Sequence, residues 1–275
     1  MKRILSVVLL IGCVFGFVIP ASAETLPPYG APRDLGAPIQ TVAAVDAAFG
    51  KEDGYNVMYT TVSGNASNPA VFNVVDLDRQ QLLRSFPLPG AVSSWAHVRT
   101  PDGRVFIGAS NKMFVYSPQT KEVTDLGEVV PAAGGGSIWA LTADDNGNVY
   151  GGTYPRGSLF RIDAATLQIT DMGQVDDGKA PGDDGKPEQY VRSLEYYNGF
   201  IYAGTGSSNG RVWKINPQTG EKVRIELPLP KTRPEYGGKY DAMGFCYGLK
   251  VVRNYLFAFF NGPFSMFVYD LDNER

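Results

Sequence analysis

Residues 137–175 read SIWALTADDNGNVYGGTYPRGSLFRIDAATLQITDMGQV. This stretch contains four runs of about five residues that are rich in β-branched and aromatic side chains. The runs are Ile138–Thr142, Val149–Thr153, Leu159–Asp163 and Ile169–Gly173, and turn-forming Gly, Asn, Asp or Pro residues separate them. Short runs bounded in this way predict four antiparallel strands joined by tight connections.

The same unit recurs along the chain. Its second strand appears five times, at separations of 48, 44, 52 and 55 residues, as Val57–Thr61, Val105–Ala109, Val149–Thr153, Ile201–Thr205 and Leu256–Phe260. Four-stranded units at this spacing are typical of a β-propeller, because one such sheet has two apolar faces that only neighbouring blades can cover. We therefore predict an all-β chain, a β-propeller of about five four-stranded blades. A β-sandwich is the alternative, but it would not repeat its turns in register.

Both ends of the repeat region bear on the blade number. Residues 33–38, RDLGAP, copy the fourth-strand motif of residues 124–128 (TDLGE), while the last residues, YDLDNER, end where a fourth strand is expected to begin. Two interpretations follow. The N-terminal strand completes the last blade as a clasp, giving five blades, or the chain is a fragment of a seven- or eight-bladed ring. We assign residues 33–275 to the propeller and residues 24–32 to a linker.

The first 23 residues have the features of a signal peptide. Lys2 and Arg3 precede an apolar run from Ile4 to Ile19, and the small residues Ala21–Ala23 supply a cleavage site. We therefore expect a secreted or extracellular protein, with a periplasmic or cell-surface location as variants. Residues 10–13, LIGC, resemble a lipoprotein cleavage box, but the apolar run continues past Cys13, which disfavours lipid anchoring.

Cleavage after Ala23 would leave 275 − 23 = 252 residues, and losing Lys2 and Arg3 would shift the net charge from −3 to −5. This acidic balance gives no electrostatic reason to expect a nucleic-acid partner. No later stretch has the roughly 20 uninterrupted apolar residues that span a bilayer, so we expect no membrane insertion. Cys246 would be the one remaining cysteine, which excludes an internal disulfide.

Two segments carry a resemblance to a known group of proteins. Tyr202–Thr205 (YAGT) and Lys214–Glu221 (KINPQTGE) resemble the repeats of secreted bacterial propellers of the quinoprotein-like and surface-layer type. The resemblance covers nearly all of the chain after the signal peptide and implies the scaffold. Quinoprotein dehydrogenases of that superfamily hold their cofactor with a pair of adjacent cysteines. This chain has only Cys246 in that region, and we predict no cofactor.

The connection lengths indicate which rim of the propeller binds a ligand. Loops from a fourth strand to the next first strand, and from a second to a third strand, emerge on one rim, and they include the long segments 174–189 and 229–244. Turns on the opposite rim are minimal. Long loops in a compact fold are usually functional or disordered, so we expect the ligand on the long-loop rim. Solvated tethers are the alternative.

Aligned first strands predict the residues that face the central channel. Trp95, Trp139, Arg192 and Tyr247 share one position of the repeat. Such a set suits stacking on sugar rings or holding a carboxylate, although the two tryptophans could instead plug the channel. Two residues earlier, and nearer the opening of the central channel, a second shared position holds Ser93, Ser137, Tyr190 and Phe245. Further loop candidates are Tyr154, Arg156, Arg233, Tyr236 and Tyr240.

The remaining chemistry-bearing residues have ordinary interpretations. His97, the single histidine, aligns with Leu141, Leu194 and Leu249, which indicates a core position rather than a catalytic base. Asp176 and Asp177 do not have the spacing of a calcium loop, so we interpret them as a solvated acidic segment and predict no metal site.

Two functions stay open from the sequence. The first is a secreted binding module that recognises a glycan or a cell-envelope component on its long-loop rim. The alternative is a polysaccharide lyase acting on uronate polymers, since several lyase families resemble this chain in being propellers. β-Elimination needs a group that neutralises the uronate carboxylate and a base. Arg192 would be the neutraliser, and Tyr190, Tyr236, Tyr240 or His97 the base.

Overall fold

The computed structural model describes residues 43–65, 67–129, 136–179, 185–207, 210–227, 245–261 and 265–275. These residues belong to one compact unit that spans residues 42–275. The predicted signal peptide, the linker and the strand-like segment 33–38 lie outside the described residues. No helix of the described part is long and apolar enough to cross a bilayer.

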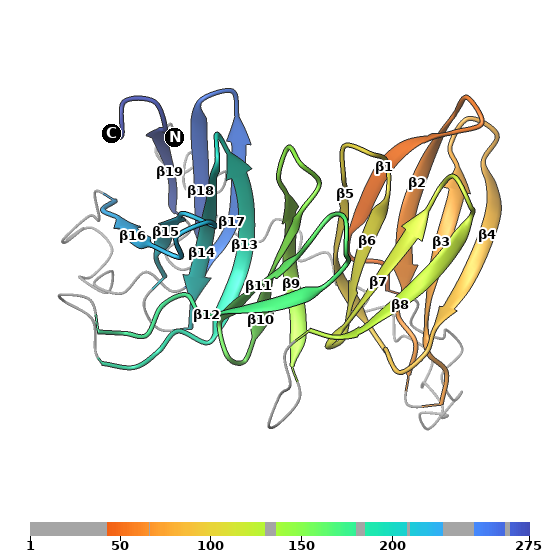
Figure 1. The fold of residues 1–275 in the computed structure, drawn as a ribbon, viewed down its shortest axis with the longest axis horizontal. Coiled ribbons are helices and arrows are strands. Elements are labelled where there is room, and N and C mark those ends of the chain that lie inside the picture. The colour runs from red at the N-terminus through yellow and green to blue at the C-terminus, as the bar shows by residue number, and fades with distance from the viewer. Residues whose placement is uncertain are drawn as a thin grey trace, which may run out of the picture. The chain divides into compact units, whose positions relative to one another are not determined.

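The described residues form antiparallel strands that follow one another in each blade (Figure 1). Blade 1 contains β1 (Ala47–Glu52), β2 (Tyr55–Val62), β3 (Ala70–Asp76) and β4 (Gln81–Leu88). Blade 2 contains β5 (Ser94–Arg99), β6 (Val105–Ala109), β7 (Lys112–Ser117) and β8 (Glu122–Glu128). Blade 3 contains β9 (Ser137–Ala143), β10 (Val149–Tyr154), β11 (Ser158–Ile162) and β12 (Ile169–Gln174).

Blade 4 contains β13 (Tyr190–Tyr197), β14 (Phe200–Gly206), β15 (Val212–Ile215) and β16 (Lys222–Ile225). The described strands of blade 5 are β17 (Phe245–Val252), β18 (Tyr255–Asn261) and β19 (Ser265–Asp270). The fold class predicted from the repeats is therefore confirmed as an all-β propeller of about five blades.

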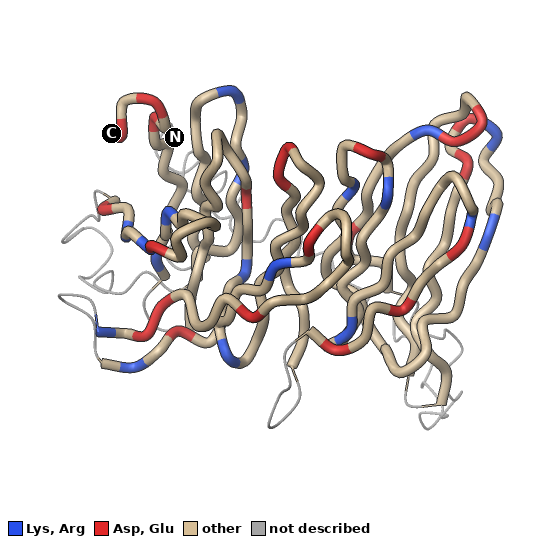
Figure 2. The backbone as a smooth tube through the Cα atoms, in the orientation of Figure 1, with Lys and Arg blue, Asp and Glu red and all other residues tan. Residues whose placement is uncertain are grey.

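The hydrophobic cores lie between consecutive blades rather than within them. Tyr59 and Phe72 of blade 1 pack with Ile107 and Tyr116 of blade 2. Three further clusters join blade 2 to 3, 3 to 4 and 4 to 5 in the same way. Each sheet thus covers the apolar face of the next, which is the physical reason that the unit must repeat. Charged residues stand mostly in turns and on outer strands, and their two signs are interspersed (Figure 2).

Glycines in the second strands let neighbouring blades approach closely. A Cβ atom added to Gly152 of β10 would lie 2.4 Å from Cγ1 of Val191 in the next blade. Gly204 of β14 faces Cys246 in the same way, with 2.7 Å from the added Cβ to the sulfur. Any larger side chain would have to displace the first strand of the following blade. The short Gly-containing motifs of the second strands are therefore a packing requirement.

Candidate functional site

A β-bulge repeats near the start of four first strands, and the same repeat position occupies it each time. In β5, Ser94 pairs with Ala109 and Ala96 with Gly108, which leaves Trp95 as the extra residue. The register shifts of β9, β13 and β17 leave out Trp139, Arg192 and Tyr247 in the same way. A bulge re-aims the side chain that it carries. It therefore sets these four side chains apart from the regular alternation of their strands.

The four bulge side chains contact one another, as their alignment predicts. Trp95 stacks on Trp139 with 4.7 Å between ring centroids and 16° between planes. The Arg192 guanidinium lies over Trp139, 5.0 Å from the ring centroid, and over Tyr247, 4.4 Å from it. Trp95 is 37% exposed and Tyr247 is 46% exposed, so solvent reaches both ends of the row. We call Trp95, Trp139, Arg192 and Tyr247 the mouth.

A second aromatic layer adjoins the mouth. Tyr190 stacks on Tyr154 with 4.0 Å between centroids and meets the Trp139 ring edge-on at 5.4 Å. Phe245 contacts the other side of Tyr190 at 4.9 Å. Burial raises the pKa of Tyr190, and the neighbouring Tyr154 hydroxyl raises it further. The Tyr190 phenol therefore stays protonated at neutral pH, which is the wrong state for a general base.

The mouth has hydrogen-bond donors without matching acceptors. Within the described chain, Nε1 of Trp139 is buried and has no hydrogen-bond partner. The Arg192 guanidinium contacts two aromatic faces, and no ion pair or hydrogen bond to it occurs among the described residues. Buried polar groups are usually satisfied, so unused donors at one place favour a ligand that brings acceptors. Oxygen-rich anions fit this requirement best.

The first blade departs from the pattern, and this explains His97. Asp46 precedes β1 at the position equivalent to Trp95, and its carboxylate accepts a hydrogen bond from the His97 backbone N–H. The imidazole lies 2.8 Å from Thr61 Oγ1 through Nε2 and 3.2 Å from Asp46 Oδ2 through Nδ1. Its side chain has no exposed surface. His97 joins blades 1 and 2, as the core interpretation predicts, and cannot touch a ligand in the mouth.

The other loop candidates fall into two groups. Arg156 is exposed in the β10–β11 loop, and its guanidinium makes no ring contact or ion pair with the described residues. Arg233, Tyr236 and Tyr240 lie outside the residues that the structure describes. Those three stay predictions.

The interpretation of Asp176 as solvated is wrong. Asp176 is 2% exposed, and its Oδ2 accepts hydrogen bonds from Trp213 Nε1 at 3.1 Å and Thr205 Oγ1 at 3.4 Å. Its Oδ1 accepts from the Gly178 N–H at 3.0 Å. The carboxylate therefore anchors the loop after β12 to blade 4. No group of three or more His, Cys, Asp or Glu side chains in the described ranges could hold a metal ion.

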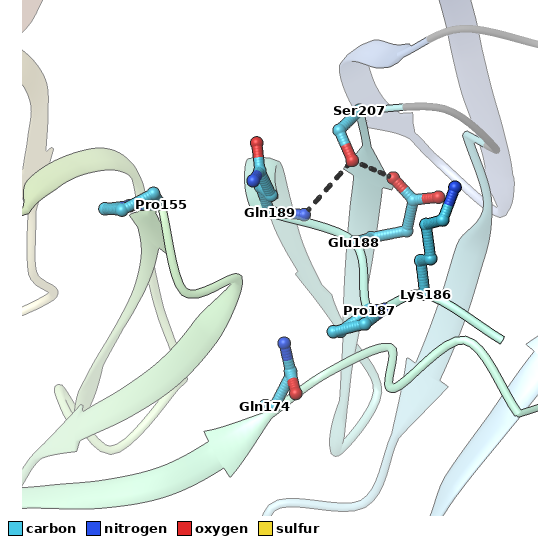
Figure 3. Close-up of a pocket in the computed structure, with 7 residues that line it drawn as sticks. All are labelled: Pro155, Gln174, Lys186, Pro187, Glu188, Gln189 and Ser207. Atoms are coloured by element: carbon cyan, nitrogen blue, oxygen red, sulfur yellow. Dashed lines mark hydrogen bonds between the residues drawn. The ribbon is translucent and has the colours of Figure 1, made fainter.

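A cavity of about 590 Å³ lies where the loop after β12 passes the β10–β11 and β14–β15 loops (Figure 3). Its lining includes Gln174, Gln189 and Ser207, none of which the sequence singled out individually. The sequence feature that pointed to this region was the length of segment 174–189. The cavity itself could not be predicted, because its walls come from three loops that are far apart in sequence.

Comparison with known proteins identifies the scaffold. No family model matches the sequence, and no curated protein matches it either. Among solved structures, virginiamycin B lyase from Staphylococcus aureus is similar at 13% identity and a TM-score of 0.53, over 82% of this chain and 69% of that one. The extracellular domain of a one-component system from B. thetaiotaomicron matches at 15% identity and a TM-score of 0.54, over 77% of this chain and 26% of that one.

The WD40 repeats of RRP9 match at 13% identity and a TM-score of 0.53, over 79% of this chain and 60% of that one. Likenesses at such low identity reveal the fold alone. They share the propeller architecture that the repeats and the interblade cores indicate. At the level of its scaffold, the chain is a β-propeller protein.

Proposed function

We propose that this chain is an exported propeller that binds an acidic glycan at its mouth. The observation that carries the proposal is the Arg192 guanidinium, held between Trp139 and Tyr247 and without an acidic partner among the described residues. Arginine binds carboxylates through paired donors, and its flat faces stack on aromatic rings. The ring contacts hold the guanidinium in place while its N–H groups remain available for a carboxylate.

The exposed aromatic faces supply the second half of the recognition. A sugar ring presents apolar C–H groups on one face and hydroxyls around its edge, so it can lie against the Trp95 or Tyr247 ring while Arg192 takes its carboxylate. The buried Trp139 N–H would donate to a ring or carboxylate oxygen once a ligand displaces the side chains that cover it. A cell-envelope polymer that contains uronate units has the required features, and export would bring the protein to it.

Isothermal titration of the mature protein with tetragalacturonate tests this function. Trp95→Ala and Tyr247→Ala should each weaken binding about tenfold or more, since each removes a stacking surface. Tyr255→Ala is the matched control, because Tyr255 has a similar exposure of 41% but lies at the β17–β18 turn on the opposite rim. Equal loss in all three variants, or no binding at all, would refute the proposal.

A uronate lyase is the second candidate, and Arg192 is the observation that favours it. The same guanidinium that binds a carboxylate would neutralise it during β-elimination. One of the similar structures is a virginiamycin B lyase, and a lyase reaction of this chain is a hypothesis that needs its own test. The raised pKa of Tyr190 suits a proton donor better than a base. Ultraviolet absorbance of an unsaturated product after incubation with polygalacturonate would demonstrate the activity.

Export itself is tested separately. If residues 1–23 are a signal peptide, the N-terminus of the protein recovered outside the cytoplasm should be Glu24. A diacylated cysteine at position 13 would instead reveal a lipoprotein. An intact Met1 would remove the basis for placing the protein at the cell envelope.

A further inference from the structure

The cavity has a different chemistry from the mouth. Gln174, Lys186, Glu188, Gln189 and Ser207 contribute amide, ammonium, carboxylate and hydroxyl groups to its wall (Figure 3). The two charged side chains have opposite signs, so the lining is close to neutral overall. At about 590 Å³ the cavity lies within the range of small-molecule sites.

The walls of the cavity are fixed by hydrogen bonds. The Glu188 N–H donates to the Asp176 carbonyl at 3.1 Å, and the Val175 N–H donates to the Gly157 carbonyl at 2.9 Å. Gly157 approaches the Glu188 carbonyl so closely that an added Cβ would lie 2.2 Å from that oxygen. Because Asp176 is itself buried and anchored to blade 4, these loops form a preorganised cavity.

One carboxylate of the wall is buried and already engaged. Glu188 is 3% exposed, and its Oε2 accepts a hydrogen bond from Ser207 Oγ at 2.8 Å. The Ser207 hydroxyl also accepts from the Gln189 N–H at 3.4 Å. A second carboxylate placed next to Glu188 would be repelled, whereas hydroxyl and amide groups would find both donors and acceptors. The lining therefore favours an uncharged polar ligand.

The cavity is linked to the mouth through residues that are adjacent in the chain. Pro155, which lines the cavity, follows Tyr154, and Gln189 precedes Tyr190. Those two tyrosines stack on each other, and Tyr190 also contacts Trp139 of the mouth. A chain-like ligand that extends from the mouth past this tyrosine pair would run toward the loops that line the cavity.

From this juxtaposition we propose that the cavity is a second subsite, which takes an uncharged sugar unit adjacent to the acidic unit in the mouth. The inference rests on the proposed function and deepens it. The ligand is then a mixed acidic polysaccharide, in which neutral and uronate units are neighbours, rather than a pure polyuronate. Arg192 recognises the acidic unit, and the side-chain amides of Gln174 and Gln189 with the Ser207 hydroxyl recognise the neutral one.

Isothermal titration with two tetrasaccharides tests the subsite. One probe alternates glucuronate with N-acetylglucosamine, and the other is tetragalacturonate. The full mature protein should bind the alternating probe roughly tenfold more tightly, the gain of one or two added hydrogen bonds. Gln189→Trp should fill the cavity and lower the affinity for the alternating probe to the affinity for tetragalacturonate. Gln189→Ala should reduce the preference for the alternating probe from roughly tenfold to roughly threefold.

The controls separate failure of the subsite from failure of the mouth. Gln218→Trp and Gln218→Ala make the same substitutions at an exposed turn between β15 and β16, and both should keep the preference. Equal affinity of the wild type for both probes, or a preference that survives Gln189→Trp, would overturn the subsite while Arg192-dependent binding upholds the mouth. Binding of neither probe, or binding that Arg192→Gln does not weaken, would overturn both.

Discussion

The indole of Trp95 stacks on the indole of Trp139 across the boundary between blades 2 and 3, with 4.7 Å between ring centroids. Both residues are the extra residue of a β-bulge in the first strand of their blade. The contact therefore depends on two bulges and on the packing of two sheets. It creates an exposed aromatic surface at a position that regular strand alternation would not provide.

The two tryptophans with buried N–H groups should respond differently to replacement by phenylalanine. Nε1 of Trp139 has no partner within the described chain, so Trp139→Phe should change the free energy of unfolding by less than about 1 kcal/mol. It should nevertheless weaken tetragalacturonate binding. Trp213 donates to the buried Asp176 carboxylate, so Trp213→Phe should cost about 1–3 kcal/mol. Urea unfolding with calorimetry checks both, and equal costs would show that the Trp139 N–H has a structural partner.

Close packing of blades 3 and 4 predicts a non-additive pair of mutations. Gly152→Ala should destabilise the fold by about 1–3 kcal/mol, because its Cβ would collide with Val191. Val191→Ala alone should cost a similar amount, since Val191 is fully buried. The double variant should lose somewhat less than the sum, because truncation relieves the contact with Cγ1 of Val191, while Cβ and the carbonyl oxygen of residue 191 still lie 2.7 Å from the new Cβ. Additive losses in urea unfolding would contradict the proposed close contact.

A buried polar cluster should be important for the packing of blade 1 on blade 2. Glu52 is 5% exposed, and it accepts hydrogen bonds from Arg84 and, at 2.9 Å, from the Tyr116 hydroxyl. Glu52→Gln should destabilise the protein by about 3 kcal/mol, because the Arg84 charge loses its counter-ion in a largely buried place. The control is Asp53→Asn, which breaks the exposed pair with Lys121 and should cost less than about 1 kcal/mol.

Stability should decline at alkaline pH. Burial raises the pKa values of Cys246, Tyr59, Tyr150 and Tyr202 to about 12, from ordinary values of 9.0 for the thiol and 10.0 for the phenols. At a pH below the ordinary pKa values, the folded and the unfolded chain both keep these protons, and the protein has the full stability that these groups contribute. As pH rises toward 12 only the unfolded chain releases them, so unfolding becomes progressively easier. A urea midpoint that is equal at about pH 8 and about pH 11 would contradict this.

Much of the fold could be predicted from the sequence, because the repeat shows itself in local patterns. The run Val149–Thr153 became β10, and the runs on either side became β9 and β11 with bounds shifted by one residue. Alignment also identified Trp95, Trp139, Arg192 and Tyr247 as equivalent, and the structure brings them together. Equivalent positions in adjacent blades must be neighbours once the sheets pack face to face.

What the sequence could not predict depends on long-range packing. An aspartate in an acidic loop has the same local pattern whether it is solvated or buried, so the Trp213 partner of Asp176 could not be foreseen. The bulges are equally invisible, because they follow from pairing rather than from composition. The cavity requires the closeness of Gly157 and Glu188, which belong to different connections.

Recognition of a carboxylate by Arg192 is the central claim, and a change in the ligand tests it most directly. Wild-type protein and Arg192→Gln are titrated with tetragalacturonate and with its methyl ester. The account predicts that the wild type binds the acid at least tenfold more tightly than the ester, and that Arg192→Gln removes this difference. Equal affinity of the wild type for acid and ester, or an unchanged difference in Arg192→Gln, would contradict it.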